Sequence, residues 1–186
     1  MIILASASPR RRELLKTVVD DFQIITADID EEKSYKLPPL EAVLDIAKRK
    51  GEKIKASHPN DVIISADTIV VLNNEIIGKP TDAENAKEIL HKLSGKKHEV
   101  ITAYCIFKNE QILEKYVISA VFFHKLDEKM IDSYVASGSP LDKAGAYGVQ
   151  DNKKFPIVEK VEGSITNVIG FPIEEIEKDL KNILKA

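Results

Sequence analysis

The side chain that most needs a chemical explanation is Asp67, because it lies in the middle of the nearly continuous apolar run 62–72. Such a run is typical of a strand that is buried on both faces of a sheet. An unpaired buried charge costs several kcal/mol, so Asp67 must contact a metal ion, a cationic side chain or solvent in a cleft. The alternative is two strands joined by a turn that Asp67 caps.

A second charged feature is the run Arg10, Arg11 and Arg12 at the predicted start of a helix. Ser8 is a good N-cap for that helix, and Pro9 suits its first position, where a missing N–H costs nothing. The unpaired N–H groups of a first turn carry positive potential and favour acidic residues, so three arginines there are unusual. The helix start is therefore a candidate anion site, and the alternative is a solvated cationic face.

The third candidate is the segment 137–152, SGSPLDKAGAYGVQDN, which is too rich in glycine and turn formers to be a regular element. Long irregular loops in compact domains are often functional. Lys143 is suited to contact a phosphate, and Gln150 carries the paired donor and acceptor that a nucleobase edge requires. A plain cluster of turns is the alternative interpretation.

Strands and helices that alternate along the chain must position these residues. The apolar patterns predict strands at residues 1–5, 22–26, 62–72, 76–77, 100–107, 112–125 and 157–161, with hairpin turns at 73–75 and 109–110. Helices are expected after Ser8, from Leu40 to Lys55, from Thr81 to Gly95, from Asp127 to Gly138 and from Pro172.

Two of these helices carry further signals. Thr81 and Glu84 match a capping box, and Gly95 falls where a left-handed C-terminal cap belongs. In the helix from Leu40 one face is apolar, and the opposite face is cationic, as is typical of a solvated face. The residues of that cationic face are Lys48, Arg49, Lys50, Lys53 and Lys55.

Length and composition set outer bounds on the protein class. The 186 residues suit one domain, which we take to span 1–186. Hydrophobic residues make up 44% and charged residues 31%, close to the average of soluble globular proteins, and the net charge of −3 argues against general nucleic-acid binding. We find no signal sequence and no apolar stretch long enough to span a bilayer, so we expect a cytoplasmic protein with no membrane partner.

The cysteine and the histidines give little sign of chemistry. The single cysteine, Cys105, lies in an apolar run, where a small buried hydrophobe is favoured over a nucleophile. His58, His91, His98 and His124 are scattered without the spacing of zinc ligands. We therefore expect no zinc site and place the histidines at the surface or at sheet edges.

Five motifs give the chain a family resemblance. LASASPRRRELL, ADTIVV, GKPTDAENA, KHEVITAY and YVASGSPLDKAGAYGVQ follow one another as they do in the Maf family, over nearly the whole chain. SPRR and DKAGAYGVQ are the most specific. The resemblance implies a nucleoside triphosphate pyrophosphatase that depends on a divalent cation, Mg²⁺ or Mn²⁺. It also implies an elongated, twisted, mixed β-sheet flanked by helices, with a central cleft, similar to the inosine triphosphate pyrophosphatases.

The resemblance also carries site residues and a substrate class. SPRR together with GVQ resembles the subgroup that acts on dTTP and UTP rather than the one that prefers 7-methyl-GTP. Asp67 matches the proposed catalytic carboxylate and, with Glu31, the expected metal site. The expected substrate-binding residues are Ser8, Arg10, Arg11, Lys50, Thr68, Lys79, Lys143 and Gln150, of which Arg10, Thr68 and Gln150 match positions associated with substrate choice. A homodimer is expected by resemblance.

Three positions depart from the family pattern. Asp151 stands where a glycine commonly follows the glutamine, Ala103 replaces a common glycine, and Ile165 replaces a common tyrosine. These departures bear on base selectivity more than on chemistry.

A nucleotide-sensing regulator of septum formation is the alternative function, since a binding protein would keep the same phosphate-binding residues. Asp67 favours the enzyme, because a carboxylate that faces a polyanion weakens binding unless a metal intervenes.

Overall fold

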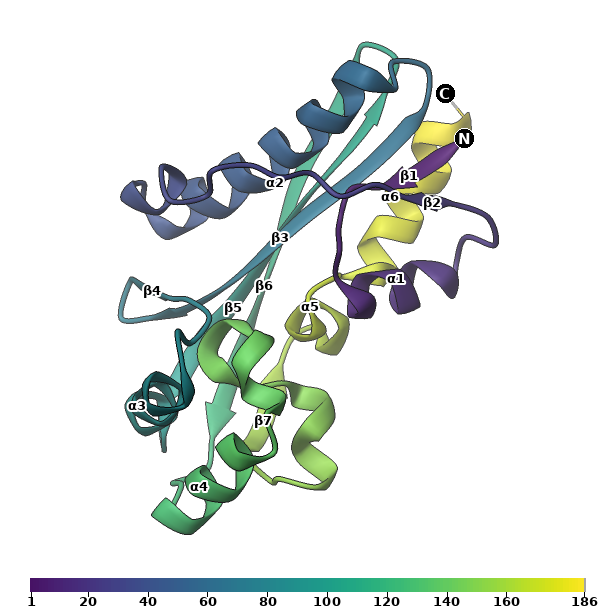
Figure 1. The fold of residues 1–186 in the computed structure, drawn as a ribbon. Coiled ribbons are helices and arrows are strands. Elements are labelled where there is room, and N and C mark those ends of the chain that lie inside the picture. Colours follow the sequence, from purple (N-terminus) through teal and green to yellow (C-terminus); the bar gives the residue numbers. More distant parts are fainter. Residues whose placement is uncertain (186) are drawn as a thin grey trace.

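The computed structural model describes residues 1–185 and is built around one long, mixed β-sheet (Figure 1). Its strands are β1 (Ile2–Leu4), β2 (Gln23–Ile24), β3 (Val62–Leu72), β4 (Glu75–Ile77), β5 (Lys97–Lys108), β6 (Gln111–Phe123) and β7 (Val158–Glu162). Within residues 1–185 the sheet has seven strands in the order β2-β1-β3-β5-β6-β7, and β4 pairs with β3 beside this path. β1 is parallel to β2 and β3, and the other pairs are antiparallel. The predicted α/β class with a mixed sheet is confirmed.

Helices cover both faces of this sheet. The α-helices are α1 (Pro9–Lys16), α2 (Pro39–Ser57), α3 (Ala83–Leu93), α4 (Glu128–Ala136), α5 (Ile165–Ile169) and α6 (Ile173–Lys185), and short 3₁₀ helices are η1 (Ser34–Lys36), η2 (Ser139–Asp142), η3 (Ala144–Ala146) and η4 (Val149–Lys153). One apolar cluster joins α2 to β3 and β5, and a second joins α1 and α6 to the opposite face of the same strands. A third lies at the far end of the sheet, under α3 and α4.

The strand β3 is continuous, so the alternative of two strands with a turn at Asp67 is wrong. Asp67 lies opposite Ala103 of β5 in the antiparallel register. On the other edge of β3, β1 pairs with residues 62–64 and β4 with residues 70–72. In the described chain no strand therefore covers residues 65–69 on that edge, and the sheet is open beside Asp67.

Most helix predictions are confirmed, with corrections at two places. The predicted capping box of Thr81 and Glu84 is wrong: α3 begins one residue after Asp82, whose carboxylate accepts the N–H of Asn85 at 2.8 Å. Asp ranks above Thr as an N-cap, so the residue preference favours Asp82, whereas the capping-box spacing of Thr81 and Glu84 had indicated a start one residue earlier. The predicted left-handed cap at Gly95 is confirmed by a φ of 64°. The helix α5 has no counterpart among the predicted elements.

One histidine prediction is wrong, because His98 is 2% exposed. The strand β5 begins at Lys97, three residues earlier than predicted, and this places His98 in the sheet. Its Nε2 lies 2.6 Å from the Tyr147 hydroxyl, and its ring packs edge-on against Phe123. Cys105 is buried as expected, and burial raises its thiol pKa to about 12.

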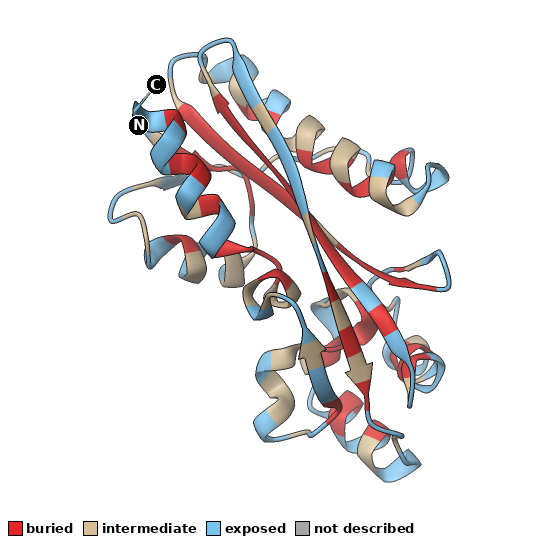
Figure 2. Ribbon diagram, turned by 180° about the vertical axis from the view of Figure 1, so that it is seen from behind, coloured by how far each residue is buried: buried red, intermediate tan, exposed pale blue. Residues whose placement is uncertain are grey.

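The burial pattern agrees with this layered arrangement. Figure 2 shows buried residues along much of the long strands and exposed residues on the outer faces of the helices. The segment 137–152, predicted to be irregular, forms turns and the three short 3₁₀ helices η2, η3 and η4. Among residues 1–185, no helix combines the length and apolar character needed to cross a membrane.

His98 should make stability depend on pH in a defined direction. Burial lowers the pKa of His98 to about 4 from an ordinary value of 6.5. Between these two pKa values the folded state binds fewer protons than the unfolded state. Stability is therefore lost as pH falls from 6.5 towards 4. From about pH 7 to pH 4, the free energy of unfolding should fall by about 3 kcal/mol more for the wild type than for His98→Gln. Urea denaturation measures this difference.

The control for this experiment is His124→Gln, because His124 is exposed. Its stability should follow the wild-type pH dependence. If stability depended on pH in the same way for the wild type and His98→Gln, the lowered pKa of His98 would be contradicted.

Candidate active site

A cleft of about 660 Å³ opens beside the uncovered edge of β3. Its walls come from α1, the segment 26–35, α2, β3, β4 with the residues after it, the loop 137–152 and the end of α5. All ten predicted site residues line it: Ser8, Arg10, Arg11, Glu31, Lys50, Asp67, Thr68, Lys79, Lys143 and Gln150. Segments that are far apart in the sequence thus meet in one place.

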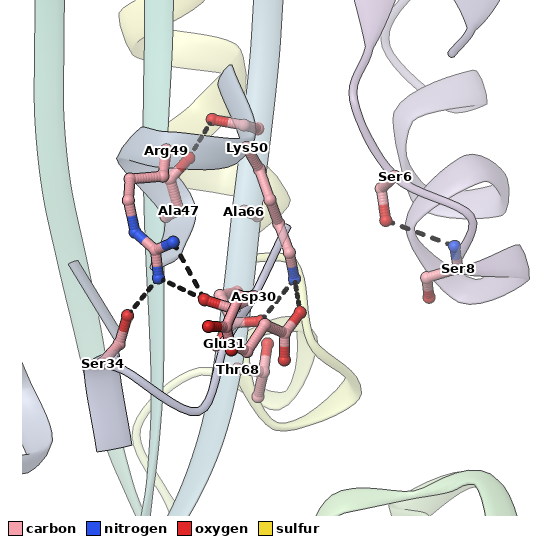
Figure 3. A network of polar contacts seen from close by, with 12 residues as sticks. Ser6, Ser8, Asp30, Glu31, Ser34, Ala47, Arg49, Lys50, Ala66 and Thr68 are labelled. Atoms are coloured by element: carbon pink, nitrogen blue, oxygen red, sulfur yellow. Dashed lines mark hydrogen bonds and ion pairs between the residues drawn. The ribbon is translucent and has the colours of Figure 1, made fainter. Parts of the chain in front are cut away.

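The charged centre of the cleft is formed by Lys50, Glu31 and Asp67. Lys50 Nζ lies 2.9 Å from Asp67 Oδ1 and 2.7 Å from Glu31 Oε1. Figure 3 shows the Lys50 side chain reaching from α2 to Glu31, which lies in the loop before η1. Lys50 is 14% exposed, so among the cationic residues of α2 it departs from the solvated face predicted for them. It provides the cationic partner that the burial of Asp67 requires.

Close packing of α2 on the sheet brings Lys50 to Asp67. The next residue, Gly51, has no side chain, and a Cβ atom there would overlap the Phe107 ring and lie 2.7 Å from Ser65 Oγ. The Ser65 hydroxyl also donates to the Ala47 carbonyl of α2 at 2.7 Å. Gly51 therefore permits the approach, and Ser65 fixes it.

The two carboxylates of the centre have their pKa values shifted in opposite directions. Burial raises the pKa of Asp67, and the attraction of Lys50 and Arg11 offsets this rise only in part. Burial would also raise the pKa of Glu31, but hydrogen bonds from Lys50 and Tyr35 hold it below its ordinary value. Such a divergence is typical of paired groups with different chemical roles. Among the described residues, Asp67 Oδ2 is buried without a hydrogen-bond partner.

Arg11 is a structural member of the cleft wall. Its guanidinium donates to the carbonyls of Gly170 and Ala66 at 2.9 and 2.8 Å. It also donates to Ser6 Oγ at 3.2 Å and to Thr68 Oγ1 at 3.0 Å. The Ala66 carbonyl belongs to the uncovered stretch of β3, so Arg11 satisfies an acceptor that no strand pairs with in the described chain. Burial lowers the Arg11 pKa.

Two further predicted residues also make contacts within the wall. The Ser8 hydroxyl accepts the Arg11 N–H at 3.4 Å, which confirms Ser8 as the N-cap of α1. The Thr68 hydroxyl lies 2.9 Å from Thr102 Oγ1 and 3.2 Å from the Gly170 carbonyl.

The cations at the mouth of the cleft share one carboxylate. Asp142 accepts from Arg10 Nη1 at 3.5 Å and from Lys143 Nζ at 2.9 Å. Arg10 comes from α1 and Lys143 from the loop 137–152, so this carboxylate links the two sides. Lys79 and Gln150 are exposed at the rim.

The departure at Asp151 has a structural explanation. Its Oδ2 accepts from the Tyr134 hydroxyl at 2.7 Å and from Ser139 Oγ at 2.6 Å, so it fixes the fold of the loop 137–152. Ile165 is exposed at the start of α5, and Ala103 is buried opposite Asp67.

Tyr35 and the apolar residues of the cleft were not among the predicted site residues. The Tyr35 hydroxyl donates to Glu31 Oε2 at 3.1 Å. Ile76, Val100 and Tyr147 line the cleft beside the charged residues. Tyr35 follows Glu31 by four residues in a segment with no periodic pattern, so the sequence held no signal for it.

The donor set for a metal ion is small. Among residues 1–185 no group of three or more His, Cys, Asp or Glu side chains is arranged to hold a metal ion. Asp67 and Glu31 supply two carboxylates on either side of Lys50. Mg²⁺ is commonly bound by one or two carboxylates together with substrate phosphates, so this pair fits such an ion.

A family model described as Maf-like protein matches residues 1–183. The chain belongs to the Maf-like protein family. Three relatives named dTTP/UTP pyrophosphatase match this Maf-like chain over almost its full length. The protein from Pyrococcus furiosus is 44% identical over 95% of this chain and 92% of its own length. Those from Geobacter metallireducens and Aquifex aeolicus are 44% and 43% identical, each over 98% of this chain and 95% of its own length.

Substitution of Gly51 tests the packing that positions Lys50 in this Maf-like protein. Gly51→Ala should lower the free energy of unfolding by about 1–3 kcal/mol, because the new Cβ atom overlaps the Phe107 ring. Urea denaturation measures this loss. Gly78→Ala is the control, since a Cβ atom there meets nothing within 4 Å, and its stability should stay near that of the wild type. Equal stabilities for both variants would show that α2 can accommodate a side chain at residue 51, and would contradict the close packing.

Proposed function

We propose that this Maf-like protein hydrolyses dTTP and UTP to the nucleoside monophosphate and pyrophosphate. The observation that carries the proposal is the enclosed Asp67 carboxylate in a cleft whose other charged groups are mostly cationic. The names of the three relatives as dTTP/UTP pyrophosphatases support the choice of substrates. A cleft of about 660 Å³ is within the range of small-molecule sites.

The cations of the cleft act on the phosphates. A triphosphate carries about four negative charges, so its hydrolysis needs donors that offset charge as it gathers on the phosphoryl oxygens. Arg10 and Lys143 are held near each other by Asp142 before substrate binds. Phosphate oxygens displace the Asp142 carboxylate from these two cations or share the cations with it. Exposed Lys79 adds a further donor from the rim. Lys50 neutralises the carboxylates of the centre.

Asp67 and Glu31 are the residues that would hold the divalent cation. The free lone pairs of Asp67 Oδ2 and the placement of two carboxylates at one point support this role. When bound, Mg²⁺ or Mn²⁺ supplies positive charge against the phosphates. Asp67, whose pKa burial raises, accepts the proton of the water that attacks the α-phosphorus. Pyrophosphate then leaves, stabilised by the cationic side chains.

Base selection belongs to the apolar part of the cleft and its rim. Half-buried Ile76 provides apolar surface for a nucleobase beside the buried lining residues Val100 and Tyr147, and Gln150 provides a donor and an acceptor for its edge. Thr68 and Arg11 act by shaping the wall, because their polar atoms already contact each other and Gly170. A nucleotide substrate also fits the predicted cytoplasmic location. The homodimer stays a prediction.

A substrate panel tests the proposed activity. Pyrophosphate release from dTTP, UTP, CTP and GTP is measured with Mg²⁺ or Mn²⁺, and dTTP and UTP should be hydrolysed fastest. Tight nucleotide binding without release of pyrophosphate would instead support the nucleotide-sensing regulator.

Substitution of Asp67 tests the mechanism. Asp67→Asn should lower turnover of dTTP and UTP by about 10²-fold or more, because it removes the proton acceptor and one metal ligand. The fold should survive, since an amide is nearly isosteric with the carboxylate. The control is Asp132→Asn, a change of the same kind at an exposed residue that pairs with Lys87. Near-normal turnover by Asp67→Asn would refute the mechanism.

A further inference from the structure

The loop that carries Glu31 has no regular structure of its own to fix it. Residues 25–31 form neither helix nor strand in the described chain. Glu31 nevertheless reaches Lys50 at 2.7 Å, which requires a defined path for the backbone. The side chain of Arg49, the residue before Lys50, makes the contacts that fix this path.

Arg49 of α2 holds this loop by its backbone and by two side chains. Its Nη1 and Nη2 atoms both donate to the Asp30 carbonyl at 2.9 Å, and Nη2 also donates to Ser34 Oγ. Its Nε donates to Asp45 Oδ2 at 2.9 Å, one helical turn earlier in α2. The Ser34 hydroxyl donates to the same Asp45 oxygen at 2.6 Å. Figure 3 shows Arg49 turned toward Asp30 and Ser34.

These contacts form a closed set between α2 and the loop. Asp45 fixes the direction of the Arg49 guanidinium. Ser34, which the guanidinium contacts on the loop side, is 1% exposed and therefore buried. The Ser34 N–H donates to the Glu31 carbonyl at 3.0 Å, which closes the turn that follows Glu31. The loop is therefore held on both sides of Glu31.

We propose that Arg49 is a positioning residue for the reaction: by holding the Asp30 carbonyl and Ser34, it places the Glu31 carboxylate against Lys50 and Asp67. This inference rests on the proposed function, in which Glu31 is a metal ligand. Consecutive residues of α2 thus have separate tasks, since Arg49 holds the backbone at residue 30 and Lys50 contacts the carboxylate at residue 31. The cationic face of α2 had indicated only solvent exposure for Arg49.

The planar fork of arginine suits this task better than lysine does. A guanidinium donates in several fixed directions at once, whereas an ammonium is a single compact charge. Lys53 also contacts the loop, by donating to the Asp28 carbonyl, but this is a single contact. Arg49→Lys should therefore lose most of the positioning effect while keeping the charge.

The experiment compares Arg49→Met with Lys48→Met. Lys48 is the preceding residue of α2 and pairs with exposed Glu114, away from the loop, so its variant is a matched control. Hydrogen exchange of the free protein should be about tenfold or more faster for peptides covering 28–37 in Arg49→Met and unchanged in Lys48→Met. This measurement does not depend on activity.

A double-mutant cycle connects the loop to the reaction. For dTTP with Mg²⁺, Arg49→Met should lower kcat/KM by about 10- to 100-fold, as is typical of residues that orient a metal ligand. In a Glu31→Gln background the same change should have almost no further effect, because the carboxylate that Arg49 positions is gone. Arg49→Lys should behave nearly as Arg49→Met does.

The outcomes distinguish the positioning role of Arg49 from the proposed hydrolysis of dTTP and UTP. Unchanged exchange at 28–37 in Arg49→Met would overturn the positioning role whatever the activity. An equal loss of kcat/KM with and without Glu31 would also overturn it, because a general structural effect gives additive losses. Absence of hydrolysis by the wild type would overturn the proposed function instead, and the exchange result would still report on the loop.

Discussion

The burial of the Asp67 carboxylate on an interior strand is the constraint on which the rest of this structure depends. Asp67 is 7% exposed in a strand that is otherwise almost wholly apolar. Such a charge is tolerated only when a cation lies close to it. Lys50 provides that cation, and it does so because Gly51 lets α2 approach the sheet. One glycine and one lysine of α2 are thus required by one aspartate of β3.

The cleft itself follows from the sheet topology. The short strands β1 and β4 cover the two ends of one β3 edge and leave the middle open. The open edge needs hydrogen-bond partners other than a strand, and Arg11 supplies one to Ala66 while it joins α1 to Gly170 near the other end of the sequence. The same gap that exposes Asp67 to the cleft therefore also gathers the first and last parts of the chain around it.

The carboxylates of the cleft are all paired with cationic side chains, although cations are in excess in the cleft as a whole. Lys50 faces Glu31 and Asp67, and Arg10 and Lys143 face Asp142. A polyanion entering the cleft then exchanges one set of ion pairs for another, which limits the cost of desolvating the cations. Asp142 is well placed to be displaced, because it is 68% exposed and lies at the mouth.

Local pattern by itself determined the long strand β3, the N-cap of α1, the irregular loop 137–152 and the need of Asp67 for a partner. Periodicity and capping report on neighbours within a turn or a strand, and these features depend on nothing more distant. Pattern also singled out Asp67, the arginine run and the loop with Lys143 and Gln150, but only the resemblance to the Maf family joined ten residues into one predicted site. The partner of Asp67, the burial of His98 and the contacts of Arg49 were decided by tertiary structure. Arg11 and Gly170 are 159 residues apart, and only the folded backbone brings such side chains and carbonyls within hydrogen-bond distance.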